Sequence, residues 1–487
     1  MDEVTLAKKK RKRRIIVIAS VLVLLITAGI LAYSYYDKLA NRTSELFTAT
    51  ATPVVTAEPV VTESDQAAVQ SPEPEATPMP DPFAAIRAAE STPSTDLSGM
   101  GNIVNIALIG VDYSEERETW SGKEGITAAH ADVIIILAVD FDNNTASLIS
   151  LPRDTYTYIP GVSGIYKLNA ALNCGGGIFA ENGAGFLKVC ETSSYLLGGI
   201  PVDYYYAVTM PAVKGLVDAI GGVTYRVEMG FTMQNRHYHS GTQHLDGQGV
   251  LDYLRVRKEA SGLDPTQAGD AHRVIRQKNM LLTIFKQLKK KDTLLNIADI
   301  IDAFDGQLFT NCTTEQTAAL ALYAYNNVDA KNISMYSMSG SGGSLYTWNF
   351  SFVKQKDRIE MIKKIYGIDV PEISEITKSA ATLEYRVRQA NRVIGVCNPL
   401  TEYVQDLLEK NGDDYSDYQK TVFDRYLAAL DECVKARNGT SSGKIQSTCS
   451  TLKHYSQQVA GIFGYRGSFD WTIPDLAEVN EIYVDFR

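Results

Sequence analysis

The chain has 487 residues, of which 45% are hydrophobic, so two or three domains with a sizeable core are possible. Its formal net charge is −10, but seven basic side chains lie within the first fourteen residues. The remainder therefore carries a charge of about −15. Such an acidic body argues against nucleic acid as a partner, because phosphate backbones require cationic surfaces.

Residues 15–33 (IIVIASVLVLLITAGILAY) form a run of nineteen positions without a charge. This is close to the length of helix that crosses the hydrocarbon core of a bilayer. The basic cluster before it predicts a single-pass type II protein of the cell membrane, with its carboxyl-terminal part outside the cytoplasm. We assign 1–14 to a basic cytoplasmic tail and 15–36 to the transmembrane anchor. A cleaved signal peptide is the alternative, but the run is long for one and no clear cleavage site follows.

Residues 37–98 are rich in Thr, Pro, Ala, Glu and Ser, which predicts a disordered, extended tether. After the tether, short β-branched runs alternate with helical patterns. Strands are expected at 104–112, 132–140, 146–151, 204–209, 223–227 and 333–338, the last followed by a Gly/Ser loop. Helices are expected at 211–222, 270–290 and 351–367. The alternation predicts an α/β fold over 99–369, an α-β-α sandwich around a mixed central sheet.

Residues 370–487 are predicted to be a separate, mostly helical region of unknown role. Two cysteine pairs have the same spacing, since Cys174 and Cys190 lie sixteen residues apart and so do Cys433 and Cys449. An oxidising compartment would permit disulfides between them, and buried free thiols are the alternative. The chain contains no CxxC motif, so a zinc knuckle is not indicated.

Several common catalytic signatures are absent from the sequence, among them a P-loop, a GxGxxG after a strand and a GxSxG elbow. Nucleotide use is therefore not indicated. A transferase outside the cytoplasm needs a donor that arrives already activated, and a polyprenyl pyrophosphate is such a donor. His237, His239 and His244 lie in a segment that is predicted to be a polar loop, so we interpret them as solvated rather than as metal ligands.

Charged residues gather at the ends of the predicted strands and helices. Asp112 follows the first buried strand and Asp132 opens the second. Two carboxylates at neighbouring strand ends could hold Mg²⁺, which prefers oxygen ligands and shares its shell with phosphate. Alternatively, each is a strand-end cap or a turn residue.

Arginine is suited to bidentate phosphate recognition. Taken singly, each arginine of this chain is better explained by a surface ion pair, but several of them together would require an anion. The cationic and polar residues at the predicted element ends are Arg153, Asp154, Lys167, Arg255, Arg257, Asp270, Arg273 and Gln277.

A series of motifs resembles the LytR–CpsA–Psr family over about residues 101–290, with a continuation to 369. The motifs occur in this order: NIALIGVD, ADVIIILAVD, SLISLPRDTY, IYKLNAA, GGIPVDYYYAV, VKGLVDAIGGVTYRV, GTQHLDGQGVLDYLRVRK and GDAHRVIRQ. The resemblance implies a membrane-anchored, Mg²⁺-assisted phosphotransferase. Such an enzyme would move teichoic acid, capsule or a related glycopolymer from an undecaprenyl-pyrophosphate carrier to peptidoglycan.

The resemblance also implies a role for each site residue. Asp112 and Asp132 resemble the metal-holding aspartates of the family. Arg153, Arg255, Arg257 and Arg273 resemble the arginines that bind the pyrophosphate. Arg276 fits the same pattern with a less favourable direction on its helix, and we add Lys167 to this set. Asp270 and Gln277 match the acidic and amide positions of a family helix motif. Beyond the resemblance, we expect catalysis to involve Arg153, Asp154, Arg255, Arg257, Asp270, Arg273 and Gln277, with either Asp270 or Asp154 as the general base.

One position departs from the family. The usual Arg-Ser-Asp-Thr is replaced here by His130-Ala131-Asp132-Val133, so a phosphate-facing arginine becomes a mostly neutral histidine. Substrate affinity or leaving-group stabilisation is therefore expected to differ. Two alternatives to transfer stay open: hydrolysis of polyprenyl pyrophosphate, and a non-enzymatic scaffold that binds lipid carrier or cell wall.

Overall fold

The computed structural model describes residues 35–39, 42–47, 93–113, 129–233, 235–256, 270–289, 304, 306–346 and 348–473. The predicted cytoplasmic tail, 1–14, and the uncharged run, 15–33, lie outside these residues. Within the described part, no helix combines the length and the apolar character that crossing a membrane requires.

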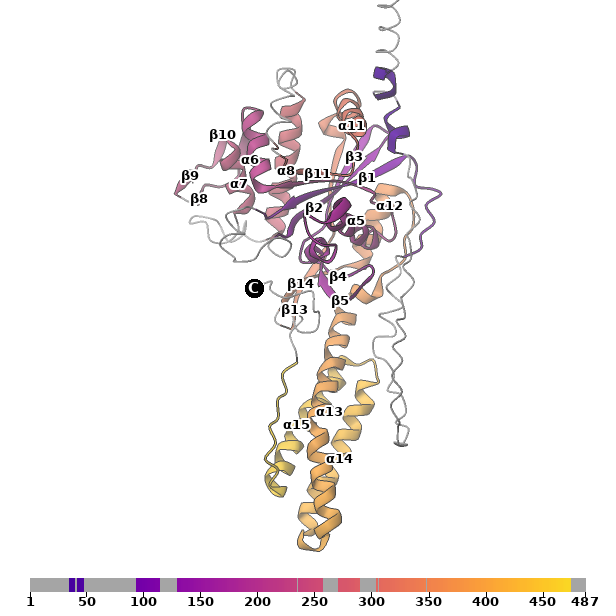
Figure 1. Ribbon diagram of the computed structural model, residues 1–487, viewed down its shortest axis with the longest axis vertical. Helices are drawn as coiled ribbons and strands as arrows, with labels where there is room; N and C mark the ends of the chain where they lie inside the picture. Colours follow the sequence, from indigo (N-terminus) through magenta and orange to yellow (C-terminus); the bar gives the residue numbers. More distant parts are fainter. Residues whose placement is uncertain are drawn as a thin grey trace, which may run out of the picture.

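A six-stranded sheet with the order β11-β6-β1-β2-β3-β12 forms the centre of the α/β domain (Figure 1). Its strands are β1 (Ile103–Val111), β2 (Ala131–Asp140), β3 (Thr145–Ser150), β6 (Tyr204–Thr209), β11 (Leu308–Thr310) and β12 (Ile333–Ser337). The pairs β1–β6 and β3–β12 are parallel, and the other neighbours are antiparallel. The prediction of a mixed central sheet is confirmed.

Helices cover both faces of this sheet. One face packs against α5 (Ala184–Leu196) and α12 (Gln355–Tyr366), and the other packs against α11 (Thr314–Asn327). Successive side chains of β1 point to opposite faces, so Ala107 lies in the core on the α5 side of the sheet and Ile106 lies in the core on the α11 side. Because both faces are buried, the strands have nearly continuous apolar sequences.

The remaining strands pair in two-stranded sheets. These are β4 (Tyr156–Ile159) with β5 (Val162–Lys167), β7 (Val223–Val227) with β10 (Gly241–Leu245), β8 (Phe231–Met233) with β9 (Arg236–Tyr238), and β13 (Gly340–Leu345) with β14 (Trp348–Val353). The other helices of the domain are α4 (Ala171–Cys174), α6 (Met210–Ala219), α7 (Gly247–Arg255) and α8 (Asp270–Leu288). Together, α6, α7, α8 and β7 to β10 enclose a second apolar core beside the sheet.

Three local predictions are wrong. The expected Gly/Ser loop forms β13, and residues 351–353 end β14 instead of beginning the next helix. The reason is that Phe350 and Phe352 alternate inward with strand periodicity and are buried. The histidine segment forms β9 and β10 through backbone pairing, although its histidines are exposed as expected.

Part of the predicted tether is ordered. The short 3-10 helix η1 (Thr43–Phe47) packs against α11, where Gln316 Nε2 donates to the Leu46 carbonyl oxygen at 2.8 Å. The Phe47 ring is 3% exposed and meets Tyr204 edge-on, with ring centroids 5.0 Å apart. The expectation of a fully extended tether fails here because Leu46 and Phe47 bury apolar surface on the domain. Residues 48–92 lie outside the described part.

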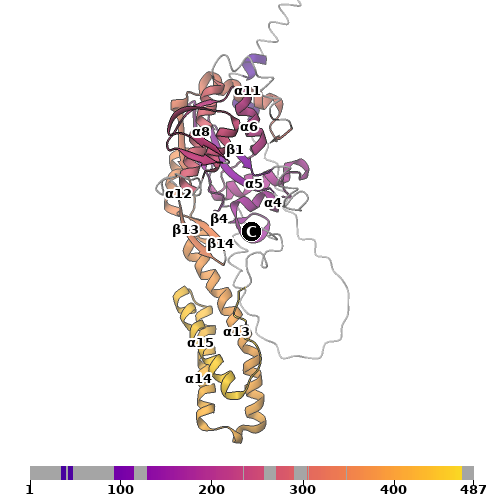
Figure 2. The ribbon, with the colours of Figure 1, turned by 90° about the vertical axis from the view of Figure 1, so that its left-hand side faces the viewer.

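The carboxyl-terminal region is helical, as predicted. It consists of α13 (Lys378–Asn411), α14 (Asp417–Arg437) and α15 (Ser442–Phe463), which pack around their own core and project from the α/β domain (Figures 1 and 2). The long helix α13 connects the two parts, because Ala381 near its start is buried in the core of the α/β domain. That core therefore extends beyond residue 369.

All six cysteines are free thiols in this structure. Cys433 on α14 and Cys449 on α15 are buried in the helical core, and their Sγ atoms are 3.6 Å apart. Cys397 on α13 is buried in the same core. The alternative of buried free thiols thus describes this structure, apart from Cys174, which is partly exposed.

Candidate functional site

Five strand ends meet at one edge of the central sheet. Register places Val111, at the end of β1, opposite Ala131 of β2 and Thr209 of β6. In the same way, Ser150 at the end of β3 pairs with Ser337 at the end of β12. Asp112, directly after β1, and Arg153, three residues after the end of β3, are therefore brought to one edge of the sheet.

Asp112 directly follows β1, and Asp132 lies in the neighbouring strand β2 at this edge. The Asp112 backbone N–H donates to the His130 carbonyl oxygen at 3.0 Å, which continues the ladder past the end of β1. The register shifts by one residue here, because Gly110 pairs with Val133 whereas Val111 pairs with Ala131. Asp132 is the extra residue of this bulge, and bulges are known to re-aim side chains next to functional sites.

Arg153 and Asp154 lie in a turn that backbone hydrogen bonds fix in place. The Thr155 N–H donates to the Pro152 carbonyl oxygen at 3.0 Å, which closes the turn after β3. The Arg153 carbonyl oxygen accepts from the Asn169 N–H at 3.0 Å, and the Asp154 carbonyl oxygen accepts from the Ser351 N–H at 2.9 Å. Hydrogen bonds from Asn169 and Ser351 thus fix the main chain at Arg153 and Asp154.

Four side chains at this edge form an alternating chain of charges. Arg153 Nη1 lies 2.6 Å from Asp132 Oδ1, and Arg153 Nε lies 3.6 Å from Asp154 Oδ2. Lys167 Nζ, at the end of β5, lies 2.9 Å from Asp154 Oδ1 and 5.2 Å from the centroid of the Trp348 ring. All four side chains are partly buried, with exposed fractions between 17% and 30%. Two cations and two carboxylates therefore share a partly desolvated site.

Arg255 joins the same edge from α7. It is the last residue of that helix, and its Nη2 lies 3.8 Å from Asp112 Oδ1. Its side chain is 46% exposed, so this contact is long and open to solvent. Arg257 lies outside the described residues. The structure thus brings Arg255 close to Asp112. It also brings Arg153 close to Asp132 and Asp154, and Lys167 close to Asp154.

The helix α8 approaches the edge as well. Lys278 Nζ donates to the Tyr336 carbonyl oxygen at 2.9 Å and to Ser337 Oγ at 2.8 Å, which attaches α8 to the end of β12. Arg273, on the amino-terminal half of α8, is buried with 6% exposure. Gln277 is partly buried on the same helix, and the Asp270 side chain lies outside the described part.

Arg276 has a packing role that the sequence did not indicate. Its Nη2 donates to the Val256 carbonyl oxygen just after α7, and its guanidinium lies 5.8 Å from the Tyr253 ring centroid. Burial lowers the pKa of Arg276, and burial likewise lowers the pKa of Lys278. Arg276 therefore holds α8 against the end of α7, and its role as a pyrophosphate ligand stays a prediction.

Two polar residues of the site were not singled out from the sequence as site residues. Asn169 is 7% exposed, and its Oδ1 has no hydrogen-bond partner among the described residues. It stands two residues after Lys167, just past the end of β5, and this position was the only signal for it. Lys278 is 6% exposed, but it follows Arg276 and Gln277 in a polar run that is typical of a solvated helix face.

The donor set fits one mode of Mg²⁺ binding. Within the described ranges, no group of three or more His, Cys, Asp and Glu side chains is arranged to hold a metal. Mg²⁺ is commonly bound by one or two carboxylates together with water and substrate phosphate oxygens. Asp112, just after β1, and Asp132, on the adjacent strand β2, each lie beside a cationic side chain, so they match this mode and not an all-protein cage.

Comparison with known proteins assigns most of this domain to one family. A model of the LytR_cpsA_psr family matches residues 83–367, more than half of the chain. The polyisoprenyl-teichoic acid–peptidoglycan teichoic acid transferase TagU of Bacillus mycoides is 30% identical over 213 residues, which are 44% of this chain and 62% of that protein. The transferase of the same name from Enterococcus faecalis is 28% identical over 218 residues, 45% and 64% of the two chains.

The chain thus spans less than two thirds of the length of these relatives. Among solved structures, B. subtilis TagU has 23% identity and a TM-score of 0.39, covering 54% of this chain and 95% of that chain. The protein gbs0355 from Streptococcus agalactiae has 23% identity and a TM-score of 0.45, covering 54% and 86%.

Proposed function

The chain belongs to the LytR–CpsA–Psr family, and from this premise we propose that it is an extracytoplasmic glycopolymer transferase. Its donor would be teichoic acid, capsule or a related polymer on an undecaprenyl-pyrophosphate carrier, and its acceptor would be peptidoglycan. The observation that carries the proposal is the set of ion pairs at one sheet edge, where Arg153 meets Asp132 and Arg255 meets Asp112.

In the proposed reaction, the pyrophosphate lies against the cationic side chains of this edge. Guanidinium groups bind phosphate oxygens in pairs, and charge that is stabilised in a partly dry site lowers the barrier to phosphoryl transfer. The residues for this role are Arg153, Lys167, Arg255, Arg257, Arg273 and Arg276, with the Gln277 amide beside them on α8.

The bond changes follow from that placement. A hydroxyl oxygen of the acceptor attacks the phosphorus next to the glycopolymer and forms a new phosphoester bond. The bond from this phosphorus to the bridging oxygen breaks, and polyprenyl phosphate leaves with that oxygen. The hydroxyl proton passes to a carboxylate, either Asp154 or Asp270. Mg²⁺, held by Asp112 and Asp132, would supply further neutralisation of the phosphate charge.

The proposal places the site outside the membrane. The uncharged run 15–33 and the basic cluster before it support a single-pass type II anchor in the cell membrane. A lipid-linked donor is confined to that membrane, so an anchored enzyme meets it without diffusing through the wall.

The test uses the full-length protein in lipid nanodiscs with a polyprenyl-pyrophosphate-linked oligosaccharide, a peptidoglycan fragment and Mg²⁺. We expect the Arg255→Ala/Arg257→Ala double variant to lose transfer by about 100-fold or more, because guanidinium contacts to developing charge are removed. Lys331→Ala, which removes a cation that is 78% exposed and away from the site, is the control. Undiminished transfer by the double variant would refute the proposal.

The same assay separates the two alternatives. Release of polyprenyl phosphate at an equal rate with and without the peptidoglycan fragment would indicate a hydrolase. Tight binding of the donor without turnover would indicate a scaffold, which the replacement of the family arginine by His130 makes worth testing.

A further inference from the structure

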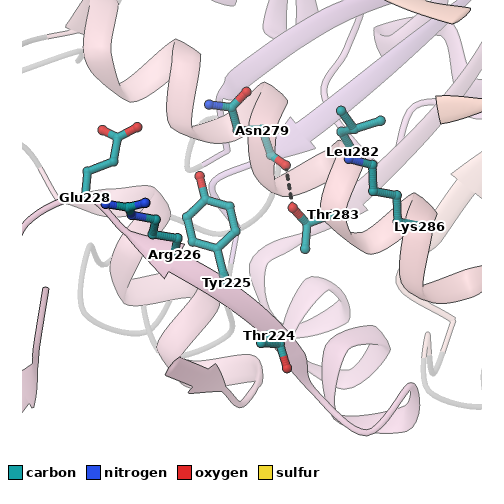
Figure 3. A pocket seen from close by; sticks show the side chains of 8 residues that line it. All are labelled: Thr224, Tyr225, Arg226, Glu228, Asn279, Leu282, Thr283 and Lys286. Atoms are coloured by element: carbon teal, nitrogen blue, oxygen red, sulfur yellow. Dashed lines mark hydrogen bonds between the residues drawn. The ribbon is translucent and has the colours of Figure 1, made fainter. Parts of the chain in front are cut away.

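A polar cavity lies between α8 and the strand β7, beside the second apolar core (Figure 3). Its volume is about 610 Å³. Among the lining residues are Tyr225 and Arg226 from β7, Glu228 directly after it, and Asn279, Thr283 and Lys286 from α8. None of these residues was singled out from the sequence, because no motif connects the residues around β7 with those of α8.

One face of α8 connects this cavity with the predicted pyrophosphate residues. Arg276, Asn279, Thr283 and Lys286 follow one another at spacings of three, four and three residues, so they lie on the same helix face. The stretch from Arg276 to Lys286 is about 15 Å long at the helical rise per residue. A polar stripe therefore runs along α8 from the arginine end into the cavity.

Side-chain contacts also link the cavity to Arg276, in addition to the shared face of α8. The Tyr225 ring, which lines the cavity, packs against Tyr253 with ring centroids 5.1 Å apart. The Arg276 guanidinium lies 5.8 Å from the same Tyr253 ring. The carboxylate of Glu228 also acts electrostatically on Arg276. The Tyr253 ring thus connects Tyr225, which lines the cavity, with Arg276, which is predicted to bind phosphate.

The lining chemistry favours a hydrated, anionic ligand over a lipid tail. The side chains of Asn279, Thr283 and Glu228 offer the donors and acceptors that bind hydroxyl groups. The hollow is open to solvent, because Arg226, Glu228 and Lys286 are exposed, so a hydrocarbon chain that lay in it would gain little from burial. Two cations, Arg226 and Lys286, stand on opposite walls and outnumber the single carboxylate among the lining residues. The cavity suits a polyol chain that carries phosphate.

Of the apolar residues of α8, Met280 and Ile284 are buried in the second apolar core, whereas Leu282 lines the cavity beside the polar residues. The polar side of the same helix is the side that faces the cavity.

We propose that this cavity binds the sugar-phosphate repeats of the glycopolymer that lie nearest to the pyrophosphate. The inference rests on the proposed transferase function and adds a subsite for the polymer to it. An anionic chain held between Arg226 and Lys286 would extend along α8 toward Arg276, which keeps the donor aligned at the sheet edge. We therefore expect the enzyme to prefer donors whose polymer bears phosphate over donors whose polymer is neutral.

The kinetic test compares two donors on the full-length protein in nanodiscs. One carries several glycerol-phosphate repeats on its polyprenyl pyrophosphate, and the other carries a single neutral sugar. We expect the Arg226→Ala/Lys286→Ala double variant to raise KM for the repeat-bearing donor about tenfold relative to KM for the single-sugar donor, the effect of losing a charged contact. Lys331→Ala/Lys356→Ala removes the same charge from side chains that are 78% and 85% exposed, and should leave the ratio unchanged.

An equal shift for both donors, or none, would overturn the inference. Titration calorimetry with a soluble glycerol-phosphate oligomer adds a readout that needs no turnover. Wild type should bind the oligomer more weakly as salt rises, and the cavity double variant should lose most of this binding. Equal binding of a neutral oligosaccharide would show that the ligand class is wrong. If wild type binds the oligomer but transfers neither donor, the proposed function fails while the subsite stands.

Discussion

Arg153 donates from Nη1 to Asp132 Oδ1 at 2.6 Å, so a cation predicted to bind pyrophosphate holds a carboxylate predicted to bind Mg²⁺. Both side chains are mostly buried, with 19% and 18% exposure. Neither charge could be withdrawn from water so far without a partner of opposite sign. Mg²⁺ and pyrophosphate therefore both compete with this ion pair. Mg²⁺ that binds Asp132 releases Arg153 for phosphate, and pyrophosphate that binds Arg153 releases Asp132 for Mg²⁺.

The first prediction is that Mg²⁺ and pyrophosphate strengthen each other's binding. Mg²⁺ on Asp132 makes Arg153 available to phosphate, so we expect Mg²⁺ to raise the affinity for a non-hydrolysable pyrophosphate analogue about tenfold, within the usual range of coupling between sites. Titration calorimetry with and without Mg²⁺ measures this. Because Mg²⁺ also binds pyrophosphate in solution, Asp132→Asn is the control. The same Mg²⁺ effect in this variant as in wild type would contradict the prediction.

The second prediction concerns Arg276, which holds α8 against the residue after α7. Arg276→Met keeps the length of the side chain but removes its hydrogen bond to the Val256 carbonyl oxygen and its charge over the Tyr253 ring. We expect the free energy of unfolding to fall by about 1–3 kcal/mol, as for other hydrogen bonds of buried charged groups. Urea denaturation followed by circular dichroism measures it.

Ile275→Met is the matched control, since the neighbouring Ile275 is 45% exposed. An Arg276→Met variant as stable as this control would show that the contact to Val256 does not hold the two helices together.

The central strands were predictable because their signal is local. Runs such as 132–140 are apolar on both faces, and only a strand between two helical layers buries them completely. The strand β14 was missed because its two buried aromatic residues, Phe350 and Phe352, lie just before a strong helical pattern. The 3-10 helix η1 was missed because Leu46 and Phe47 are few among polar neighbours, and their burial depends on α11.

The contacts within the site could not be predicted in the same way. Their strand-end positions indicated that Asp112 and Asp132 could lie together, and the resemblance to the family implied that Arg153 joins them. Which carboxylate Arg153 contacts depends on the bulge at Asp132, a one-residue register shift that no local pattern encodes. Arg257 and the Asp270 side chain lie outside the described residues, so their roles stay predictions.

The third prediction concerns Glu384, at the junction of α13 with the α/β domain. Its Oε2 accepts from the Tyr156 hydroxyl at 3.1 Å, and its Oε1 accepts from Arg388 Nη2 at 2.9 Å. Burial is the largest influence on this carboxyl group and raises its pKa above the ordinary value, although Arg388 acts in the opposite direction. The folded state therefore keeps the proton at pH values where the unfolded state has lost it.

The sign of the pH effect follows. The free energy of unfolding should decrease as pH rises from the ordinary glutamate pKa, about 4.3, through the raised value, because the folded state binds more protons in that window. Below the window the contribution of Glu384 is fully present. Denaturation at a series of pH values should show this decrease in wild type and not in Glu384→Gln. A parallel pH profile for the two proteins would mean that Glu384 titrates normally.

The last prediction concerns the thiols of the helical region. The Sγ atoms of Cys433 and Cys449 are 3.6 Å apart, so these two thiols need little movement to form a bond. With oxidised glutathione as the oxidant, two thiols give one disulfide and two molecules of reduced glutathione. We expect the Cys433–Cys449 bridge to form before any bridge to Cys397, and slowly, because both thiols must first be exposed by local opening.

Peptide mapping by mass spectrometry identifies the bridge, and Cys449→Ser is the control that cannot form it. Closing a loop of this length should raise the free energy of unfolding by about 3 kcal/mol, mainly through the entropy of the unfolded chain. Unfolding with and without reductant measures this difference. A first bridge from Cys433 to Cys397, or a bridge that lowers stability, would show that α14 and α15 do not present the two sulfur atoms as the structure places them.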